Sequence, residues 1–270
     1  MKGRLGSLFA GIGGFELALE EWYEPEWQVE NNRQCNQLLS AKWPNRRRYG
    51  DVRWCWVDLT PIDLLAAGDP CQCRSVALRR APKGSRKAPD LSGYVLAIAD
   101  RLRPRWVLRE NVLSPDVVHV VAGLDTLRYR TCVVHLDGAD FTACHRRRQF
   151  VVASLDHSVH RRFERLVAQH EDVRRHGPAG PKDRSLVLPC LLASDGGKQF
   201  SSDSGYVWEQ ERGILRKLAP EERERALGFP AGWTAGFAPT RRGSMLGNSV
   251  NVPCVRWIGN RINQAEANRR

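Results

Sequence analysis

Residues 68–75, GDPCQCRS, carry the side chains best suited to nucleophilic chemistry. The preceding apolar segment, residues 61–68, is typical of a buried strand, so Cys71 is expected just beyond a strand end, where open α/β sheets bind ligands. Residues 74–89 contain six basic residues and no acidic one. Such a field lowers a thiol pKa and attracts phosphate, which favours a reactive thiol beside a nucleic-acid track.

Other fates for Cys71 are less well supported. A zinc site needs about four ligands, but the nearest candidates, Cys55 and the Cys144–His145 pair, lack finger-like spacing. We therefore expect no metal. Eight cysteines in 270 residues are too sparse for a disulfide scaffold. A buried, inert thiol, the usual state of a free cysteine, stays as the alternative.

A glycine-rich turn, GIGG at residues 11–14, joins a predicted strand to a predicted helix. This arrangement holds a nucleotide-like ligand against a helix N-terminus. A dinucleotide fingerprint would need glycine where Glu16 stands, and a pyrophosphate beside a glutamate is unfavourable. The turn better suits a ligand with one small anionic group, such as a carboxylate. A tight turn without a ligand is the alternative.

Two acidic residues extend this interpretation. Glu30 ends the next predicted strand, 17 residues after Gly13, where an acid accepts hydrogen bonds from ribose hydroxyls. Asp51 follows a further short strand and is placed to accept from an adenine amino group. Together these features predict an adenosyl ligand that carries a carboxylate, and S-adenosylmethionine is such a ligand.

The elements that must position these residues alternate between strands and helices as far as Leu155, which argues for an open α/β sheet. Residues 156–212 lose this pattern and predict a loop-rich insert with scattered basic residues. A short helix from Glu221 and a last helix over residues 252–262 complete the expected elements. The expected strands are residues 5–11, 26–30, 48–52, 61–68, 103–111, 130–138 and 148–155, and the expected helices are residues 15–22, 31–43, 94–102 and 116–129.

Composition narrows the class of protein. With 42% hydrophobic residues the chain can bury a full core, and its net charge of +12 favours a polyanionic partner. We find no apolar run near the roughly 20 residues that cross a bilayer. The N-terminal apolar run is interrupted by glycines and lacks a cleavage site, so we expect a cytoplasmic protein that is not exported.

The residues resemble the cytosine-5 DNA methyltransferases in the family's order. SLFAGIGGF is similar to the cofactor-binding motif, GDPCQCRS to the nucleophile loop, and ENV to the glutamate motif. CHRRRQFVVA resembles the arginine motif, and LAPEERERALGFP and GNSVNVP resemble the last two motifs. The short insert and YGDVR look closest to the de novo branch. The matching segments are residues 7–15, 68–75, 110–112, 144–153, 218–230 and 247–253.

The resemblance implies a Rossmann-like S-adenosylmethionine-dependent methyltransferase fold, with a mixed, mostly parallel sheet, helices on both faces and a small loop-rich target-recognition insert. It implies methyl transfer to C5 of a cytosine flipped out of duplex DNA, since a stacked base hides its reacting carbons. Cys71 would add to C6, Glu110 would donate a proton toward N3, and Arg146 and Arg148 would contact O2 of the base and hold the Cys71 loop or a phosphate.

The implied binding residues form two groups. Those expected at S-adenosylmethionine are Phe9, Gly11, Ile12, Gly13, Glu30, Asn31, Asp51, Val52, Asn248 and Ser249. Those expected at DNA are Gln72, Arg74, Ser75, Arg79, Arg80, Lys83, Arg86 and Lys87. Residues 1–155 and 239–270 would form the catalytic domain, and residues 156–238 the small target-recognition domain.

The sequence departs from the family pattern at several positions. Asp69 stands where the family usually has Phe or Pro, Arg74 where it has Phe, and Cys144 where it has Gln.

Two other functions compete with DNA methylation. One is that of an RNA cytosine-5 methyltransferase, which uses the same chemistry. The other is a catalytically silent nucleic-acid-binding regulator, although every required residue type is present.

Overall fold

The computed structural model describes residues 1–55, 58–70, 90–176, 188–192, 206–209 and 212–267. Cys71 and all eight of the residues expected at DNA lie outside these ranges, as does Cys73.

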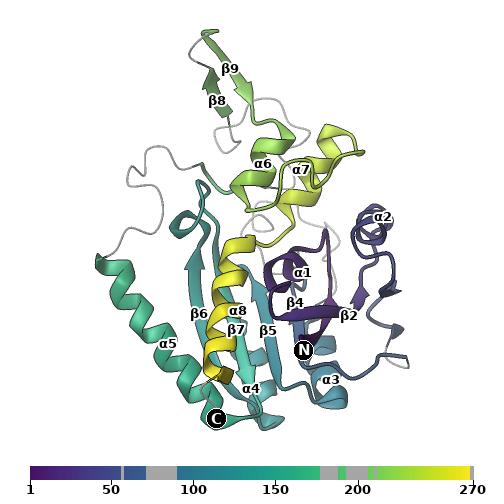
Figure 1. The fold of residues 1–270 in the computed structure, drawn as a ribbon, viewed down its shortest axis with the longest axis vertical. Coiled ribbons are helices and arrows are strands. Elements are labelled where there is room, and N and C mark those ends of the chain that lie inside the picture. The colour runs from purple at the N-terminus through teal and green to yellow at the C-terminus, as the bar shows by residue number, and fades with distance from the viewer. Residues whose placement is uncertain (56–57, 71–89, 177–187, 193–205, 210–211, 268–270) are drawn as a thin grey trace, which may run out of the picture.

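The described residues form a seven-stranded sheet of order β3-β2-β1-β4-β5-β7-β6 (Figure 1). β1, β2, β3, β4 and β5 run parallel, whereas β7 is antiparallel to both β5 and β6. This confirms the expected mixed, mostly parallel sheet. The strands are β1 (Gly3–Leu8), β2 (Tyr23–Val29), β3 (Arg47–Tyr49), β4 (Leu64–Ala67), β5 (Trp106–Asn111), β6 (Arg130–Asp137) and β7 (Arg147–Ser154).

Helices cover both faces of this sheet because its strands are apolar on both sides. Leu64 and Ala66 of β4 face one hydrophobic cluster, shared with α1, α2, α5 and α8. Leu65 and Ala67 face the other, shared with α3 and α4. These helices are α1 (Gly14–Leu19), α2 (Arg33–Lys42), α3 (Ser92–Leu102), α4 (Val117–Thr126), α5 (His157–His176) and α8 (Val252–Ala267).

Helix α5 differs from the expected loop-rich insert, which was predicted to begin at residue 156. Val159 and Phe163 of α5 are fully buried, and His160 stacks on Trp106 of β5 with ring centroids 6.1 Å apart. Apolar residues at helical spacing were present in the sequence, but the many charged residues between them obscured the pattern. The first part of the segment therefore packs on the catalytic sheet.

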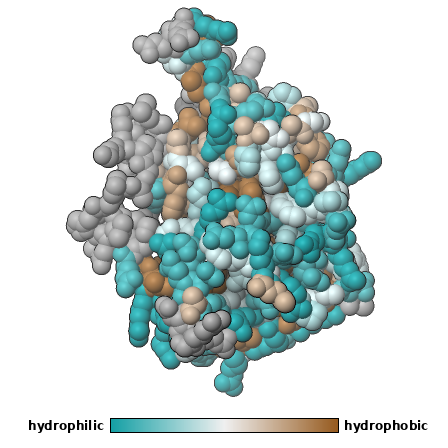
Figure 2. Space-filling model, viewed as in Figure 1, coloured by the Kyte–Doolittle hydropathy of each residue, from teal (hydrophilic) through white to brown (hydrophobic). Residues whose placement is uncertain are grey.

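The remaining elements lie beyond the carboxyl edge of the parallel strands. Helices α6 (Pro220–Ala226) and α7 (Pro239–Gly247) adjoin the glycine turn, and the hairpin of β8 (Tyr206–Glu209) and β9 (Ile214–Lys217) projects away from the sheet (Figure 1). Most of the face in Figure 2 is hydrophilic. Trp208 and Leu215, paired across the hairpin, are 60% and 51% exposed.

Candidate active site

The glycine turn leaves β1 through left-handed backbone that only small residues adopt readily. Gly11 has φ 56° and Gly13 has φ 82°, and a Cβ on Gly13 would collide with the ring of Trp43. Phe9 also has a positive φ of 56°, a conformation that costs about 1–3 kcal/mol and persists where the surroundings enforce it. The turn is thus held in one shape at the start of α1.

Glu30 closes the turn from the end of β2. Its carboxylate accepts hydrogen bonds from the main-chain nitrogens of Gly11, at 2.8 Å, and Asn32, at 2.7 Å. Asn32 in turn caps α2, since its side chain accepts from the nitrogens of Gln34 and Cys35. Burial raises the pKa of Glu30, although these backbone hydrogen bonds oppose the shift. The carboxylate is therefore fixed in position at 8% exposure.

A pocket of about 180 Å³ opens beside Glu30 at the carboxyl ends of the strands. It brings together five of the ten residues expected at the cofactor. Its lining also includes residues that the sequence did not single out, among them Arg53 and Leu91. The lining residues are Phe9, Val29, Glu30, Asn31, Gly50, Asp51, Val52, Arg53, Pro70 and Leu91.

Asp51 lines this pocket with its carboxylate already engaged. Nε of Arg53 lies 3.0 and 3.1 Å from its two oxygens, and Nη2 lies 2.7 Å from Oδ2. These hydrogen bonds from Arg53 lower the pKa of Asp51. The spacing of Arg53, two residues after Asp51, was the signal available in the sequence for this pair.

The other predicted cofactor residues lie around the glycine turn rather than in the pocket. Ile12 is buried in the core at 1% exposure. A Cβ on Gly14 would approach Val250 and the hydroxyl of Ser249, so the turn after α7 packs against the glycine turn. Asn248 is exposed beside it. Gly11 contributes through its main-chain nitrogen, as described above.

Glu110 and Arg148, both predicted to be catalytic, meet at the same edge of the sheet. Arg148 Nε lies 2.9 Å from Glu110 Oε1, and both side chains are largely buried. Oε1 is a buried oxygen without a hydrogen bond of good geometry among the described residues. The pair comes from adjacent antiparallel strands, β5 and β7. The carboxyl group of Glu110 can therefore form a further hydrogen bond in a site that is largely shielded from solvent.

Arg146 is directed elsewhere. Its guanidinium donates to the carbonyls of Leu191, at 3.3 Å, Gly247, at 3.1 Å, and Ser249. It is 3% exposed. In the described structure Arg146 joins the segment just before β7 to the turn after α7, while Arg148 is the arginine beside Glu110.

A further buried cluster, which sequence reasoning missed, lies on the other face of β5. Arg109 and Asn111 both bond Asp69, two residues before Cys71 in the chain. The departure at Asp69 from the family pattern was the available signal. Its partner Arg109 could not be identified without the register of β4 against β5.

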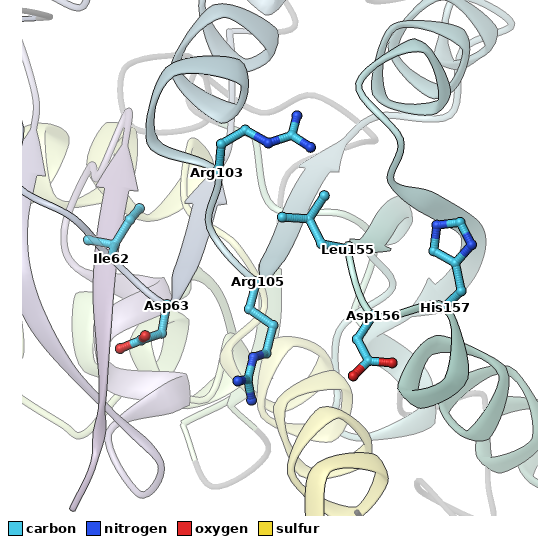
Figure 3. A pocket seen from close by; sticks show the side chains of 7 residues that line it. All are labelled: Ile62, Asp63, Arg103, Arg105, Leu155, Asp156 and His157. Atoms are coloured by element: carbon cyan, nitrogen blue, oxygen red, sulfur yellow. The ribbon is translucent and has the colours of Figure 1, made fainter.

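A second hollow, of about 680 Å³, lies at the opposite edge of the sheet (Figure 3). Its side chains come from the segments before β4 and β5 and after β7. Open α/β sheets bind ligands at the carboxyl edge of their parallel strands, so this hollow is not the expected catalytic site. The residues that line it are Ile62, Asp63, Arg103, Arg105, Leu155, Asp156 and His157.

The described residues contain no group of three or more His, Cys, Asp or Glu residues arranged to hold a metal ion. Within the same ranges, no helix combines the length and apolar character needed to cross a membrane.

The fold is that of the methyltransferases. The chain superposes on the Entamoeba histolytica methyltransferase EhMeth with a TM-score of 0.70, at 15% identity, covering 98% of both chains. It superposes on the S. pombe Dnmt2 methyltransferase with a TM-score of 0.68, at 17% identity, covering 97% of this chain and 99% of the other.

Sequence comparison gives the family. The model for C-5 cytosine-specific DNA methylases matches residues 3–172 and 191–264, and the chain belongs to this family. It is a DNA (cytosine-5-)-methyltransferase, and the family uses S-adenosylmethionine as methyl donor.

Bacterial relatives agree with this assignment. The type II methyltransferase M2.BsuMI of Bacillus subtilis is 27% identical, covering 96% of this chain and 75% of the relative. M.NlaX of Neisseria lactamica is 26% identical, covering 96% and 95%. The expected closeness to the de novo branch is not supported, because the sequence relatives are bacterial type II methyltransferases.

Proposed function

We propose that this chain transfers a methyl group from S-adenosylmethionine to C5 of a cytosine flipped out of duplex DNA, with Cys71 as the covalent catalyst. One observation carries the proposal. Pro70, the residue directly before Cys71, lines the same pocket as Glu30. The start of the proposed nucleophile loop therefore adjoins the proposed cofactor pocket, which supports the assignment.

The residues of the pocket suit the cofactor. Glu30 has both oxygens fixed by backbone donors and retains lone pairs that can accept from ribose hydroxyls. Phe9, Val29, Val52 and Leu91 supply apolar lining for an adenine ring. The start of α1 offers main-chain nitrogens to a carboxylate. When bound, the cofactor supplies an electrophilic methyl group.

The chain's own residues activate the cytosine. The thiolate of Cys71 forms a bond to C6, and the ring electrons become available at C5. Glu110, in its protonated form, donates its proton toward N3, which relieves the charge that develops on the ring, and takes it back when the adduct breaks down; Arg148 beside it contacts O2. After methyl transfer the C5 proton leaves to a base and the bond between sulfur and C6 breaks, which frees Cys71.

Duplex DNA is the proposed partner. Residues 74–89 would contact phosphates, and the projecting hairpin β8–β9 belongs to the proposed target-recognition domain. The part of α5 that precedes residue 170 packs on the sheet. We therefore propose that the target-recognition domain starts after α5 rather than at residue 156. The excess of positive charge, +12 for the chain, is consistent with action on DNA inside the cell.

Covalent trapping tests the proposal. Bisulfite sequencing of DNA from an expressing host first identifies the methylated site. A duplex with 5-fluorocytosine at that site should then accept the methyl and stay bound, since fluorine cannot leave as a cation. The complex should survive denaturing electrophoresis and should need S-adenosylmethionine for efficient formation.

Three variants assign the chemistry. Cys71→Ser should abolish the adduct, because a hydroxyl has no comparable anionic fraction at neutral pH. Cys73→Ser, the matched control in the same loop, should leave it intact. Glu110→Gln should slow trapping strongly, because an amide cannot transfer a proton toward N3. An adduct lost with Cys73→Ser and kept with Cys71→Ser would overturn the nucleophile assignment.

A further inference from the structure

The ion pair between Asp69 and Arg109 is almost inaccessible to solvent. Arg109 Nε lies 2.6 Å from Asp69 Oδ1, Nη2 lies 2.7 Å from Oδ2, and each side chain is 1% exposed. Asn111 adds hydrogen bonds from Nδ2 to the main-chain oxygen of Asp69, at 3.0 Å, and to Oδ2, at 3.1 Å. Asp69 is thus held through both its side chain and its backbone.

This cluster joins two segments that are 40 residues apart in sequence. Asp69 follows β4 and leads into the predicted nucleophile loop, whereas Arg109 and Asn111 belong to β5. Successive side chains of a strand point to opposite faces. Arg109 and Asn111 therefore bond Asp69 on one face of β5, while Glu110 between them reaches Arg148 on the other.

We propose that Arg109 and Asp69 are positioning residues that hold the start of the nucleophile loop, Asp69 and Pro70, against β5 beside Glu110. The inference rests on the proposed function of Cys71 and Glu110. The proposal gives a positioning role in catalysis to the bidentate ion pair of Asp69 and Arg109, which contacts neither the base nor the cofactor pocket.

The chain between Asp69 and Cys71 transmits this position with little freedom. Proline fixes φ of Pro70 near −65° and confines the backbone of Asp69, the residue before it, to extended conformations. Covalent geometry alone keeps the Cα of Cys71 within about 7 Å of the Cα of Asp69. A shift of Asp69 relative to β5 is therefore passed on to the thiol.

The lead-in to the nucleophile loop also lies close to Glu110 in space. Gly68, next to Asp69, would place a Cβ 3.8 Å from Glu110 Oε2. The lead-in to the loop consequently passes the catalytic carboxylate directly. Geometry at such a site is stringent, because a misplacement of about 1 Å can cost about 100-fold in rate.

A buried ion pair allows the structural and catalytic contributions to be separated. Removing one partner leaves an uncompensated buried charge and destabilises the fold, whereas replacing both by apolar residues of similar volume is often neutral or stabilising. We would compare Arg109→Met, Asp69→Leu and the double variant Asp69→Leu/Arg109→Met with the parent. The matched control is Glu24→Leu/Arg46→Met, which removes an exposed ion pair of 2.9 Å far from Glu110.

The measurements are the melting temperature, the affinity for S-adenosylmethionine by calorimetry, and the single-turnover rate of trapping on 5-fluorocytosine DNA. We expect the double variant to recover the melting temperature that the single variants lose and to bind the cofactor as the parent does. Its trapping rate should stay about 10- to 100-fold below that of the parent. The exposed control pair should leave all three values unchanged.

Two results would overturn the inference. A double variant that recovers both the melting temperature and the trapping rate would assign the pair a purely structural role. A double variant that stays unfolded would also contradict the inference, with one exception. The inference would stand if the single variants Asp69→Asn and Arg109→Lys, which retain hydrogen bonding, fold and form the covalent adduct slowly. Failure of the proposed function looks different, because then the parent enzyme itself would form no adduct that depends on Cys71.

Discussion

The indole nitrogen of Trp233 donates a hydrogen bond of 2.9 Å to the main-chain oxygen of Ile12. These residues lie at opposite ends of the chain, and the bond ties the segment after α6 to the glycine turn. Trp233 also packs edge-on against Trp43, with ring centroids 6.0 Å apart, and Trp43 fills the space beside Gly13. The C-terminal segment therefore braces the turn from two sides.

Trp233→Phe should weaken this brace. The change keeps an aromatic ring but leaves the buried oxygen of Ile12 without this donor, which costs about 1–3 kcal/mol of stability. S-adenosylmethionine affinity should fall as well, because the glycine turn loses a fixed contact. Urea unfolding and calorimetry test both, with Trp54→Phe as the control, since Trp54 is 79% exposed. Unchanged cofactor affinity would show that the turn holds its shape without the brace.

Glu30→Ala should reduce affinity for S-adenosylmethionine. Loss of a hydrogen bond to a charged acceptor costs about 1.5–3 kcal/mol, which corresponds to about 10- to 150-fold in Kd. The backbone nitrogens of Gly11 and Asn32 also lose their acceptor. Calorimetry measures the effect, and Glu20→Ala on the exposed surface is the control. Cofactor binding as tight as in the parent would contradict the assignment of Glu30 to the ribose.

The sequence was sufficient for the sheet and for half of the residues that line the pocket beside Glu30. Strand-like and helical segments up to residue 155 alternate in the order that the structure confirms, because apolar periodicity is a local property. Glu30 and Asp51 were placed together because each follows a predicted strand, whereas Phe9 was implied by the family resemblance; all three line the pocket. The order in which the strands lie side by side is a tertiary property that local periodicity does not give, and it was not predicted.

What the sequence did not indicate are pairings between distant segments. Arg109 lies within an apolar strand, and only the register of β4 against β5 brings it to Asp69. Arg53 was not predicted to hold Asp51, since either residue alone is compatible with a solvated surface. The hairpin β8–β9 was missed because it lies in a segment poor in periodic apolar residues.

Affinity for DNA should fall steeply with salt through residues 74–89. Each neutralised phosphate adds about −0.9 to the slope of log K against log salt. Replacing Arg79, Arg80, Lys83 and Lys87 together by Gln should flatten this slope by about 2–4 units. Fluorescence anisotropy over a series of salt concentrations measures it. An unchanged slope would place the phosphate contacts elsewhere, with the hairpin β8–β9 as the next candidate.

In the parent protein, ionisation of Glu16 should lower the free energy of unfolding as the pH rises. The substitution Glu16→Gln should remove this loss. Glu16 is 1% exposed, and burial raises its pKa although hydrogen bonds from Ser7 and Gln28 oppose the shift. The folded state therefore binds a proton more tightly than the unfolded state, so stability falls as pH rises from about 4.5 through the raised pKa. The loss is about 1.4 kcal/mol for each pH unit in this window.

The Gln variant cannot ionise at this position, so its advantage over the parent should grow with pH across the same window. Urea unfolding at pH 5 and pH 8 compares the two proteins. Ser7 and Gln28 can still donate to the amide oxygen, so the buried network is retained. Parallel stability curves for parent and variant would mean that Glu16 stays in one protonation state throughout.

Glu224 should show the opposite dependence on pH. Its fully buried carboxylate accepts from the nitrogens of Gly232 and Thr234, the hydroxyl of Thr234 and the guanidinium of Arg242. Although burial opposes the shift, hydrogen bonds from Thr234 and Arg242 lower its pKa. The unfolded state binds the proton more tightly, so the stability from Glu224 is complete above about pH 4.5 and is lost as pH falls through the lowered pKa.

Glu224→Ala should cost about 3–5 kcal/mol at pH 7, because it leaves Arg242 and several buried donors unpaired. Glu224→Gln should cost less, about 1.5–3 kcal/mol, since one amide oxygen can still accept from Thr234. The difference between parent and Gln variant should shrink as the pH is lowered below about 4.5, because the unfolded parent then binds a proton at Glu224 that the folded parent does not yet bind. Guanidinium unfolding from pH 3 to pH 7 measures this convergence. Exposed Glu21, changed to Gln, should give no such trend, and a constant difference for Glu224→Gln across the series would show that its carboxylate is not the group that titrates.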